Sequence, residues 1–98
     1  MIDVLSEGDF RRLVRWAKTV GAKVVFDLEG FKFRLVIDKF IHAEDKSGRE
    51  VPWREAFGSI LPWDLPSRFR VREVRVKLGS SEVVFDMEGF KKYLSKLK

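Results

Sequence analysis

Cysteine, asparagine and glutamine are absent from the 98-residue chain, and histidine occurs once. Without cysteine, the chain forms no disulfide, no thiolate metal site and no cysteine nucleophile. A single histidine excludes a two-histidine metal site and a Ser-His-Asp triad with a spare base, so we expect His42 to be a strand residue near a turn. Glycine-rich phosphate loops are also missing. We therefore expect no cofactor, no bound metal and no catalysis.

Long apolar runs are missing as well, since none approaches the about 18 residues that a transmembrane helix needs. The first ten residues carry three acids and no base, unlike a signal peptide. These features favour a cytoplasmic protein without membrane contact. The lack of amides and cysteine, together with 36% charged residues, is the composition of a hyperthermophile protein.

Apolar residues make up 45% of the chain, and nine Phe and three Trp give it unusual aromatic weight. That is enough to bury a core, and the length suits one core, so we expect a single domain over residues 1–98. The spacing of apolar residues predicts an α+β fold. A small antiparallel sheet built from hairpins is packed by an N-terminal helix, a short middle helix and a C-terminal helix.

The N-terminal helix is predicted over Glu7–Val20, between a capping box at Ser6 and Asp9 and a stop at Gly21. Alternation then predicts a hairpin of strands 23–29 and 31–38 across Glu29-Gly30, with Phe26 and Phe33 buried. A third strand over 40–44 follows, and 49–53 pairs back after a turn at 45–48.

Pro52 is expected to open the short helix, which extends to Leu61. The two prolines of segment 62–67 predict a loop without regular structure. A strand over 70–78, with Val74, Val76 and Leu78 inward, then turns into a strand over 82–88. The last helix is predicted to begin after Gly89.

Segments 23–35 and 82–94 match at nine of thirteen positions. The repeat places Asp27, Glu29, Asp86 and Glu88 on outward strand positions, where they could hold Mg²⁺ if the two strands were neighbours. The competing interpretation is pairing with nearby bases. We expect charge partners, and the predicted bases are Lys32, Arg34, Arg75 and Lys77.

The net charge is +5, and +4 of it falls in residues 70–98, where eight bases face four acids. Aromatic residues interleave with bases just before and within this region. Single-stranded nucleic acid is bound by this mixture, because cations track phosphates and flat side chains stack on bases. The candidate contacts are Trp53, Arg54, Trp63, Arg68, Phe69, Arg70, Arg72, Arg75 and Lys77. The alternative is that the aromatics anchor the core or loops.

Three segments carry a family resemblance: Glu50-Val-Pro-Trp-Arg-Glu-Ala-Phe57, Arg70-Val-Arg-Glu-Val-Arg-Val-Lys-Leu78 and Glu82-Val-Val-Phe-Asp-Met-Glu-Gly-Phe-Lys-Lys-Tyr-Leu94. From about residue 40 onward the chain resembles the ThermoDBP family, which binds single-stranded DNA, or in some relatives RNA, in hyperthermophilic archaea. The resemblance implies a small antiparallel sheet with helices and a cleft with an apolar floor and basic edges. Family members may add a C-terminal leucine-zipper helix for dimerisation, and this sequence has barely two helical turns there.

We therefore predict binding of single-stranded DNA or RNA without catalysis. One alternative is a protein–protein interaction module, such as a homodimer, with Trp16 or Trp63 as its anchor. Another is a Mg²⁺-dependent nuclease built on the four carboxylates of the repeat.

Overall fold

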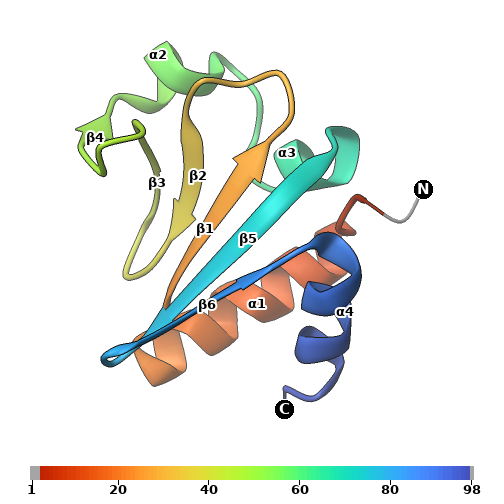
Figure 1. Cartoon of the computed structure of the whole chain (residues 1–98). Helices are drawn as coiled ribbons and strands as arrows, with labels where there is room; N and C mark the ends of the chain where they lie inside the picture. Colours follow the sequence, from red (N-terminus) through yellow and green to blue (C-terminus); the bar gives the residue numbers. More distant parts are fainter. Residues whose placement is uncertain (1–2, 98) are drawn as a thin grey trace.

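In the computed structural model, which describes residues 3–97, six strands form one antiparallel sheet in the order β4-β3-β2-β1-β5-β6 (Figure 1). The elements are α1 (Glu7–Val20), β1 (Lys23–Leu28), β2 (Arg34–Ile37), β3 (Ile41–Glu44), β4 (Glu50–Val51), α2 (Trp53–Phe57), α3 (Asp64–Arg68), β5 (Val71–Leu78), β6 (Ser81–Phe85) and α4 (Met87–Ser95). The predicted α+β architecture is confirmed. Within residues 3–97, none of the helices combines the length and apolar character of a membrane span.

Helix α1 begins and ends where the sequence predicts. The Ser6 hydroxyl accepts a hydrogen bond from the Asp9 N–H at 3.2 Å and so satisfies one free donor of the first turn. Gly21 ends the helix at φ 73°, a left-handed conformation that a side chain would disfavour, and its N–H bonds to the Ala17 carbonyl.

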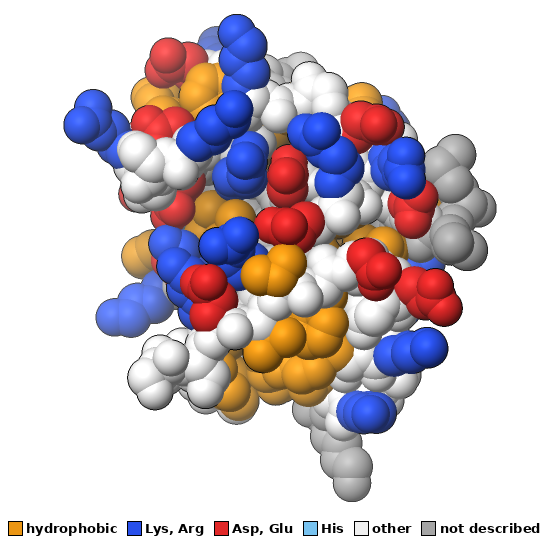
Figure 2. Space-filling model, viewed as in Figure 1, with side chains coloured by type: hydrophobic (Ala, Val, Ile, Leu, Met, Phe, Trp, Pro, Cys, Tyr) orange, Lys and Arg blue, Asp and Glu red, His pale blue; other side chains and the backbone are white. Residues whose placement is uncertain are grey.

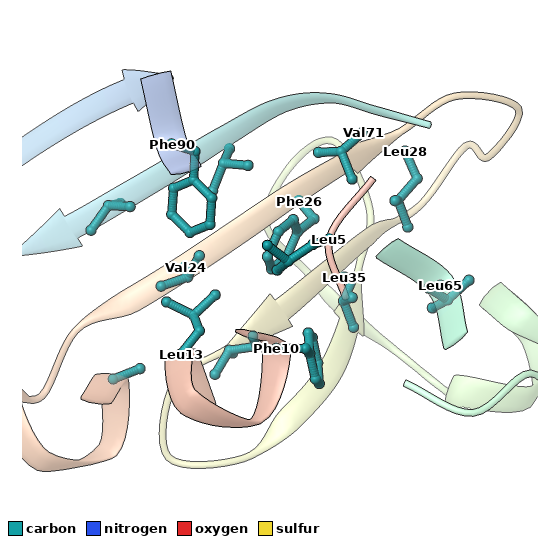
Figure 3. Close-up of a cluster of buried hydrophobic side chains, with 14 of the residues drawn as sticks. Leu5, Phe10, Leu13, Val24, Phe26, Leu28, Leu35, Leu65, Val71 and Phe90 are labelled. Carbon is teal, nitrogen blue, oxygen red and sulfur yellow. The ribbon is translucent and has the colours of Figure 1, made fainter. Parts of the chain in front are cut away.

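The core lies between the sheet and the two long helices, α1 and α4 (Figure 3). Phe26 on the central strand β1 is completely buried, with its ring centroid 6.3 Å from Phe10 of α1 and 6.0 Å from Phe90 of α4. The short helices close one end of this core through Phe57 and Leu65. One face of the sheet is therefore covered by helices, and the other carries mostly polar side chains around Val25 and the buried Val36.

The predicted pairing of β1 with β2 is confirmed, with Phe26 buried and Phe33 half-buried. The connection is longer than the expected turn and spans residues 29–33, so Phe26 lies opposite Leu35. Phe31 holds this connection down, because its ring packs edge-on against Phe57 at 5.4 Å and against Phe69 at 4.9 Å.

Two predictions in the middle of the chain are wrong. The short helix α2 ends at Phe57, where Gly58 follows at φ 63°, and does not extend to Leu61. Segment 62–67 is not an irregular loop, since residues 64–68 form the one-turn helix α3. Pro66 is tolerated because it lies in the first turn, where a backbone N–H has no helical partner. Leu78 lies on the same face of β5 as Val74 and Val76, as predicted, but it is the last residue of the strand and is 41% exposed.

The start of the last helix also differs from the prediction. Helix α4 begins at Met87 and contains Gly89, because the Asp86 carboxylate accepts a 2.7 Å hydrogen bond from the Gly89 N–H and caps the first turn. The equivalent aspartate of the first repeat, Asp27, lies inside strand β1 and pairs with Arg34 across the ladder. The same sequence pattern thus forms part of a strand in the first repeat and the start of a helix in the second repeat.

Replacing Asp86 by alanine is expected to lower the free energy of unfolding by about 1 kcal/mol, the usual cost of losing an N-cap side chain. Urea or guanidinium unfolding followed by circular dichroism measures this change. Glu88→Ala is the control, since this exposed carboxylate makes a 3.9 Å pair with Lys92 that we expect to contribute less than 0.5 kcal/mol. Equal losses in the two variants would contradict the capping role.

Candidate nucleic-acid interface

The three predicted stacking aromatics are half-buried and packed against the core. The indole N–H of Trp53 donates to the Ile60 carbonyl at 3.0 Å, and its ring lies 4.8 Å from Phe57. Phe69 packs on Phe31. Trp63 is covered by the Arg11 guanidinium, which lies 4.9 Å from its ring centroid. These contacts favour the anchoring interpretation for all three.

The predicted bases are accessible, but folding brings carboxylates to most of them, chiefly from other elements. Arg54 is exposed on α2. The remaining five each have an acidic partner: Arg68–Asp64 at 3.9 Å, Arg70–Asp3 at 2.8 Å, Arg72–Asp27 at 3.5 Å, Arg75–Glu82 at 3.4 Å and Lys77–Glu82 at 3.4 Å. Residues 68–77 carry five bases and one acid, and this local excess of +4 is therefore largely offset in three dimensions.

Two of these bases belong to the polar face of the sheet. Arg75 and Lys77 lie on β5 opposite Val25 and Lys23 of β1, so two lysines face each other directly across the ladder. Like charges in that position repel. Together with Arg34 of β2 they line a groove of about 220 Å³ that the β3–β4 turn borders with Lys46.

An open cleft of about 910 Å³ adjoins this groove and shares Lys23, Glu44 and Gly48 with it. Its walls come from the end of α1, the β2–β3 turn and the β3–β4 hairpin. The small residues Ala17 and Ala22 line it together with Lys18, Gly21, Lys23, Asp38, Lys39, Phe40, Ile41, His42, Glu44, Gly48 and Glu50. We call this space the Phe40 cleft.

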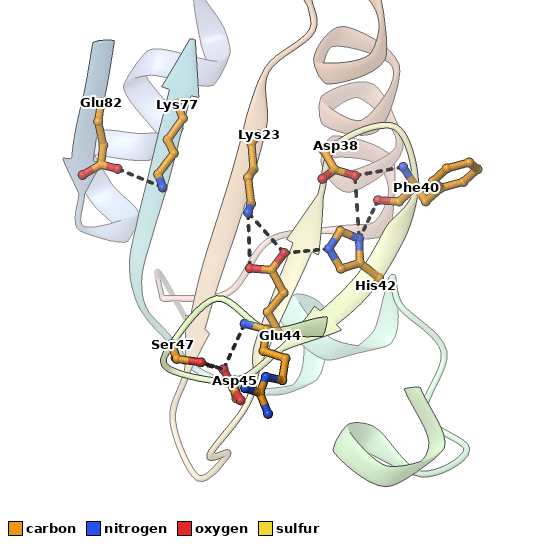
Figure 4. Close-up of polar contacts among 10 residues, drawn as sticks. Lys23, Asp38, Phe40, His42, Glu44, Asp45, Ser47, Lys77 and Glu82 are labelled. Atoms are coloured by element: carbon orange, nitrogen blue, oxygen red, sulfur yellow. Dashed lines mark hydrogen bonds and ion pairs between the residues drawn. The ribbon is translucent and has the colours of Figure 1, made fainter. Parts of the chain in front are cut away.

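Phe40 is 74% exposed, the highest value among the exposed large hydrophobic residues of the described chain. The turn that carries it is fixed by two bonds: the Phe40 N–H donates to the Asp38 carboxylate, and the Asp38 N–H donates to the Phe40 carbonyl, each at 3.1 Å. The Phe40 ring therefore projects into solvent from an ordered backbone at the cleft (Figure 4).

A polar network forms the wall of the Phe40 cleft next to the sheet (Figure 4). Glu44 is 7% exposed and accepts from Lys23 Nζ at 3.1 Å and from His42 Nε2 at 2.8 Å. The other ring nitrogen, Nδ1, lies 3.3 Å from the Phe40 carbonyl oxygen. His42 is thus a strand residue beside a turn, as predicted, and it connects β3 to the backbone that carries Phe40.

Lys18 and Lys39 are the exposed cations of the cleft, and within residues 3–97 neither forms an ion pair. Glu44, by contrast, is occupied by Lys23 and His42. The cleft is therefore lined by an exposed aromatic ring and by two lysines whose charge no carboxylate of the described chain offsets by contact. Figure 2 shows bases and acids intermixed over the neighbouring sheet face.

The β3–β4 hairpin, which borders both the cleft and the groove, is ordered by Asp45. Its carboxylate accepts from the Ser47 hydroxyl at 2.6 Å, the Ser47 N–H at 2.9 Å and the Arg49 N–H at 3.0 Å. These bonds lower the pKa of the Asp45 carboxyl group, because they stabilise its charged form. The bond from the Ser47 hydroxyl has the largest effect and the bond from the Arg49 N–H the next largest. Ser47 and Arg49 thus hold the loop beside Lys46 in one conformation.

The four carboxylates of the repeat do not gather, because β5 lies between β1 and β6. Asp27 pairs with Arg34 and Arg72, Glu29 with Arg70, and Glu88 with Lys92, whereas Asp86 caps α4. Arg34 is a predicted partner, whereas Arg75 and Lys77 pair with Glu82, and Lys32 accepts a hydrogen bond from Arg34 through its backbone carbonyl. Among the residues that the structure describes, no three His, Asp or Glu side chains are placed to hold a metal ion. The neighbouring strands that the nuclease alternative requires are not formed.

Sequence reasoning missed Phe40, Lys18, Lys39 and Lys46. Phe40 was predicted to be the first residue of the third strand, whereas it lies in the turn before β3. The signal available in the sequence was Asp38. An aspartate favours a turn because its carboxylate accepts a hydrogen bond from the backbone N–H two residues later, which here belongs to Phe40. Lys18 is far away in sequence and is brought near by the packing of α1 on the sheet.

Comparison with known proteins gives no relative: no protein-family model, curated protein or solved structure matches the chain. The resemblance to the ThermoDBP family stays a prediction.

Proposed function

We propose that the protein binds single-stranded nucleic acid, DNA or RNA, in the Phe40 cleft. The observation that carries the proposal is the exposed Phe40 ring, held on an ordered turn in a cleft that Lys18 and Lys39 also line. Aromatic stacking on a base and neutralisation of the flanking phosphates are the two contacts that sequence-tolerant single-strand binding uses. No catalytic step is part of the proposal, and the cytoplasm is the compartment that it implies.

The sheet-face groove extends the proposed site. Lys23 lines both the cleft and the groove. A bound nucleic acid that leaves Phe40 can therefore place its phosphates first along Lys23 and Lys46 and then along Lys77 and Arg75. Two of the bases predicted from the sequence are thereby retained. Acids also line the groove, so we expect weak and strongly salt-dependent binding, in the range of about 10⁻⁴ to 10⁻⁶ M at physiological salt.

Replacing Phe40 by alanine is expected to weaken binding to a fluorescent single-stranded oligonucleotide by about 1–3 kcal/mol, or about 5- to 150-fold. Fluorescence anisotropy over a range of salt concentrations measures both the affinity and its salt slope. The slope should stay nearly constant, because the lost contact carries no charge. Phe40→Trp should bind as the parent does, and Phe40→Leu, which keeps apolar area without a flat ring, should bind like the alanine variant.

Leu61→Ala is the matched control, since Leu61 is also an exposed apolar residue but lies outside the Phe40 cleft. A parent protein that binds no single strand even at low salt would remove the proposed function. If the parent binds and Phe40→Ala binds equally well, the function stands and the cleft is the wrong place.

A further inference from the structure

The two edges of the sheet are constructed differently. β4 has two residues and is followed at once by Pro52, and short strands and proline both prevent pairing with another chain. β6 has five residues, pairs with β5 without a bulge, and contains neither proline nor lysine. Natural monomers protect an edge of this length, and the only such protection within β6 is the charge of Glu82.

Apolar side chains are exposed along this edge. Val83 is 50% exposed, Val84 is 47% exposed, and Leu78 on the adjacent end of β5 is 41% exposed. Three half-buried rings lie beside them, with Phe85 5.0 Å from Tyr93 and Tyr93 5.9 Å from Trp16. Figure 2 shows a hydrophobic area in the lower half of the view, where Figure 1 places β6 and α4.

The backbone of β6 is unpaired on its outer side. Within residues 3–97, no backbone hydrogen bond from a loop or another element reaches segment 81–85. Gly79, at φ +62°, followed by Ser80 without a positive φ, fits a two-residue type II′ hairpin. Leu78 and Ser81 next to the turn then bond to each other, so the alternation of the ladder leaves the N–H and C=O groups of Glu82 and Val84 pointing outward.

We propose that β6 pairs antiparallel with β6 of a second copy of this chain. In the twofold register centred on Val83, Glu82 and Val84 of one copy lie opposite Val84 and Glu82 of the other, and their free groups bond to each other. The two Val83 side chains meet at the axis on the helix side of the sheet. The exposed apolar edge is covered, and the two sheets become one.

Charge complementarity favours a second copy as the occupant. In this register four side chains lie in a row across the polar face. They are Arg75 and Val84 of one copy, followed by Glu82 and Lys77 of the other copy. Each Glu82 already lies 3.4 Å from Arg75 and from Lys77 of its own chain, so the two acids at the interface are both neutralised. A register centred on Glu82 would place the two Glu82 side chains opposite each other, and one centred on Val84 would place Glu82 opposite Asp86. Both arrangements bring like charges together and are therefore disfavoured.

Sedimentation equilibrium of the full chain from about 1 µM to about 1 mM tests the proposal. The parent is expected to reach twice the chain mass of 11.5 kDa within this range. Val83→Lys should stay monomeric and folded by circular dichroism, because it places two lysines opposite each other at the axis while the side chain is half-exposed in the monomer. Leu61→Lys, at a position equally exposed but distant from β6, is the control and should dimerise as the parent does.

A charge-swap experiment separates pairing at Val83 from a general loss of stability. Val83→Glu alone should also be monomeric, and an equimolar mixture of Val83→Lys and Val83→Glu should form a heterodimer, since lysine then lies opposite glutamate. A parent that stays monomeric at about 1 mM overturns the proposal. A Val83→Lys variant that still dimerises, or a mixture that does not, overturns it equally.

Discussion

Replacing Phe26 by alanine is expected to lower the free energy of unfolding by about 3–5 kcal/mol, the largest loss that we expect from a single substitution. Phe26 lies on the central strand with no exposed surface and packs against Phe10 and Phe90 of the two long helices. Removing the ring loses its burial and leaves a cavity that β1, held between β2 and β5, cannot move to close. The free energy of unfolding of a small domain is about 5–15 kcal/mol in total, so a large share of the stability depends on this residue.

Guanidinium unfolding measured by fluorescence and circular dichroism gives the loss. Phe40→Ala is the control, because the same substitution at a 74% exposed position removes little buried area and should change the unfolding free energy by less than about 0.5 kcal/mol. A loss below about 1 kcal/mol for Phe26→Ala would mean that the core is not organised around β1.

The parts of the fold that the sequence predicts correctly are those set by local signals. Helix α1 carries Ser6 at its start and Gly21 at its end, and both act through backbone groups within four residues. The strands were visible because one face of the sheet is covered by helices, which imposes strict alternation on β1 and most of β5.

The errors occur where a distant contact or a position within an element decides the structure. Pro66 is compatible with α3 only because it falls in the first turn, and Gly89 is compatible with α4 because Asp86 caps that turn. The longer β1–β2 connection is held by Phe31 against Phe57 and Phe69, residues more than twenty positions away in the chain. Composition and periodicity contain no information about such contacts.

The candidate site was harder to predict than the fold, because charge along the sequence is not charge on the surface. Arg70 and Arg72 appear as an excess in the chain, yet folding places Asp3 and Asp27 beside them. An exposed aromatic ring is equally hidden from the sequence, since Phe40 directly precedes the apolar Ile41 and is easily taken as the first residue of that strand.

Reversing the charge of the two cleft lysines, in the double variant Lys18→Glu and Lys39→Glu, is expected to weaken single-strand binding at least about 25-fold at about 0.1 M salt. A phosphate contact on a single strand contributes about 0.7 to the salt slope, which is about fivefold in affinity at that salt concentration, and two contacts are lost. The two new carboxylates add repulsion. The magnitude of the salt slope should fall by about 1.4 or more, in contrast to the unchanged slope expected for Phe40→Ala.

The matched control is the double variant Lys32→Glu and Lys96→Glu, which changes the net charge of +5 by the same amount. Lys96 ends α4 much as Lys18 lies in the last turn of α1, and Lys32 and Lys39 are both exposed residues outside the helices and strands, but neither control residue lines the cleft. Equal weakening in the two double variants would mean that net charge alone governs binding. A third variant, Arg70→Ala with Arg72→Ala, tests the surface that the sequence predicted. If it weakens binding more than the cleft variant does, the nucleic acid lies along the β5 arginines and not beside Phe40.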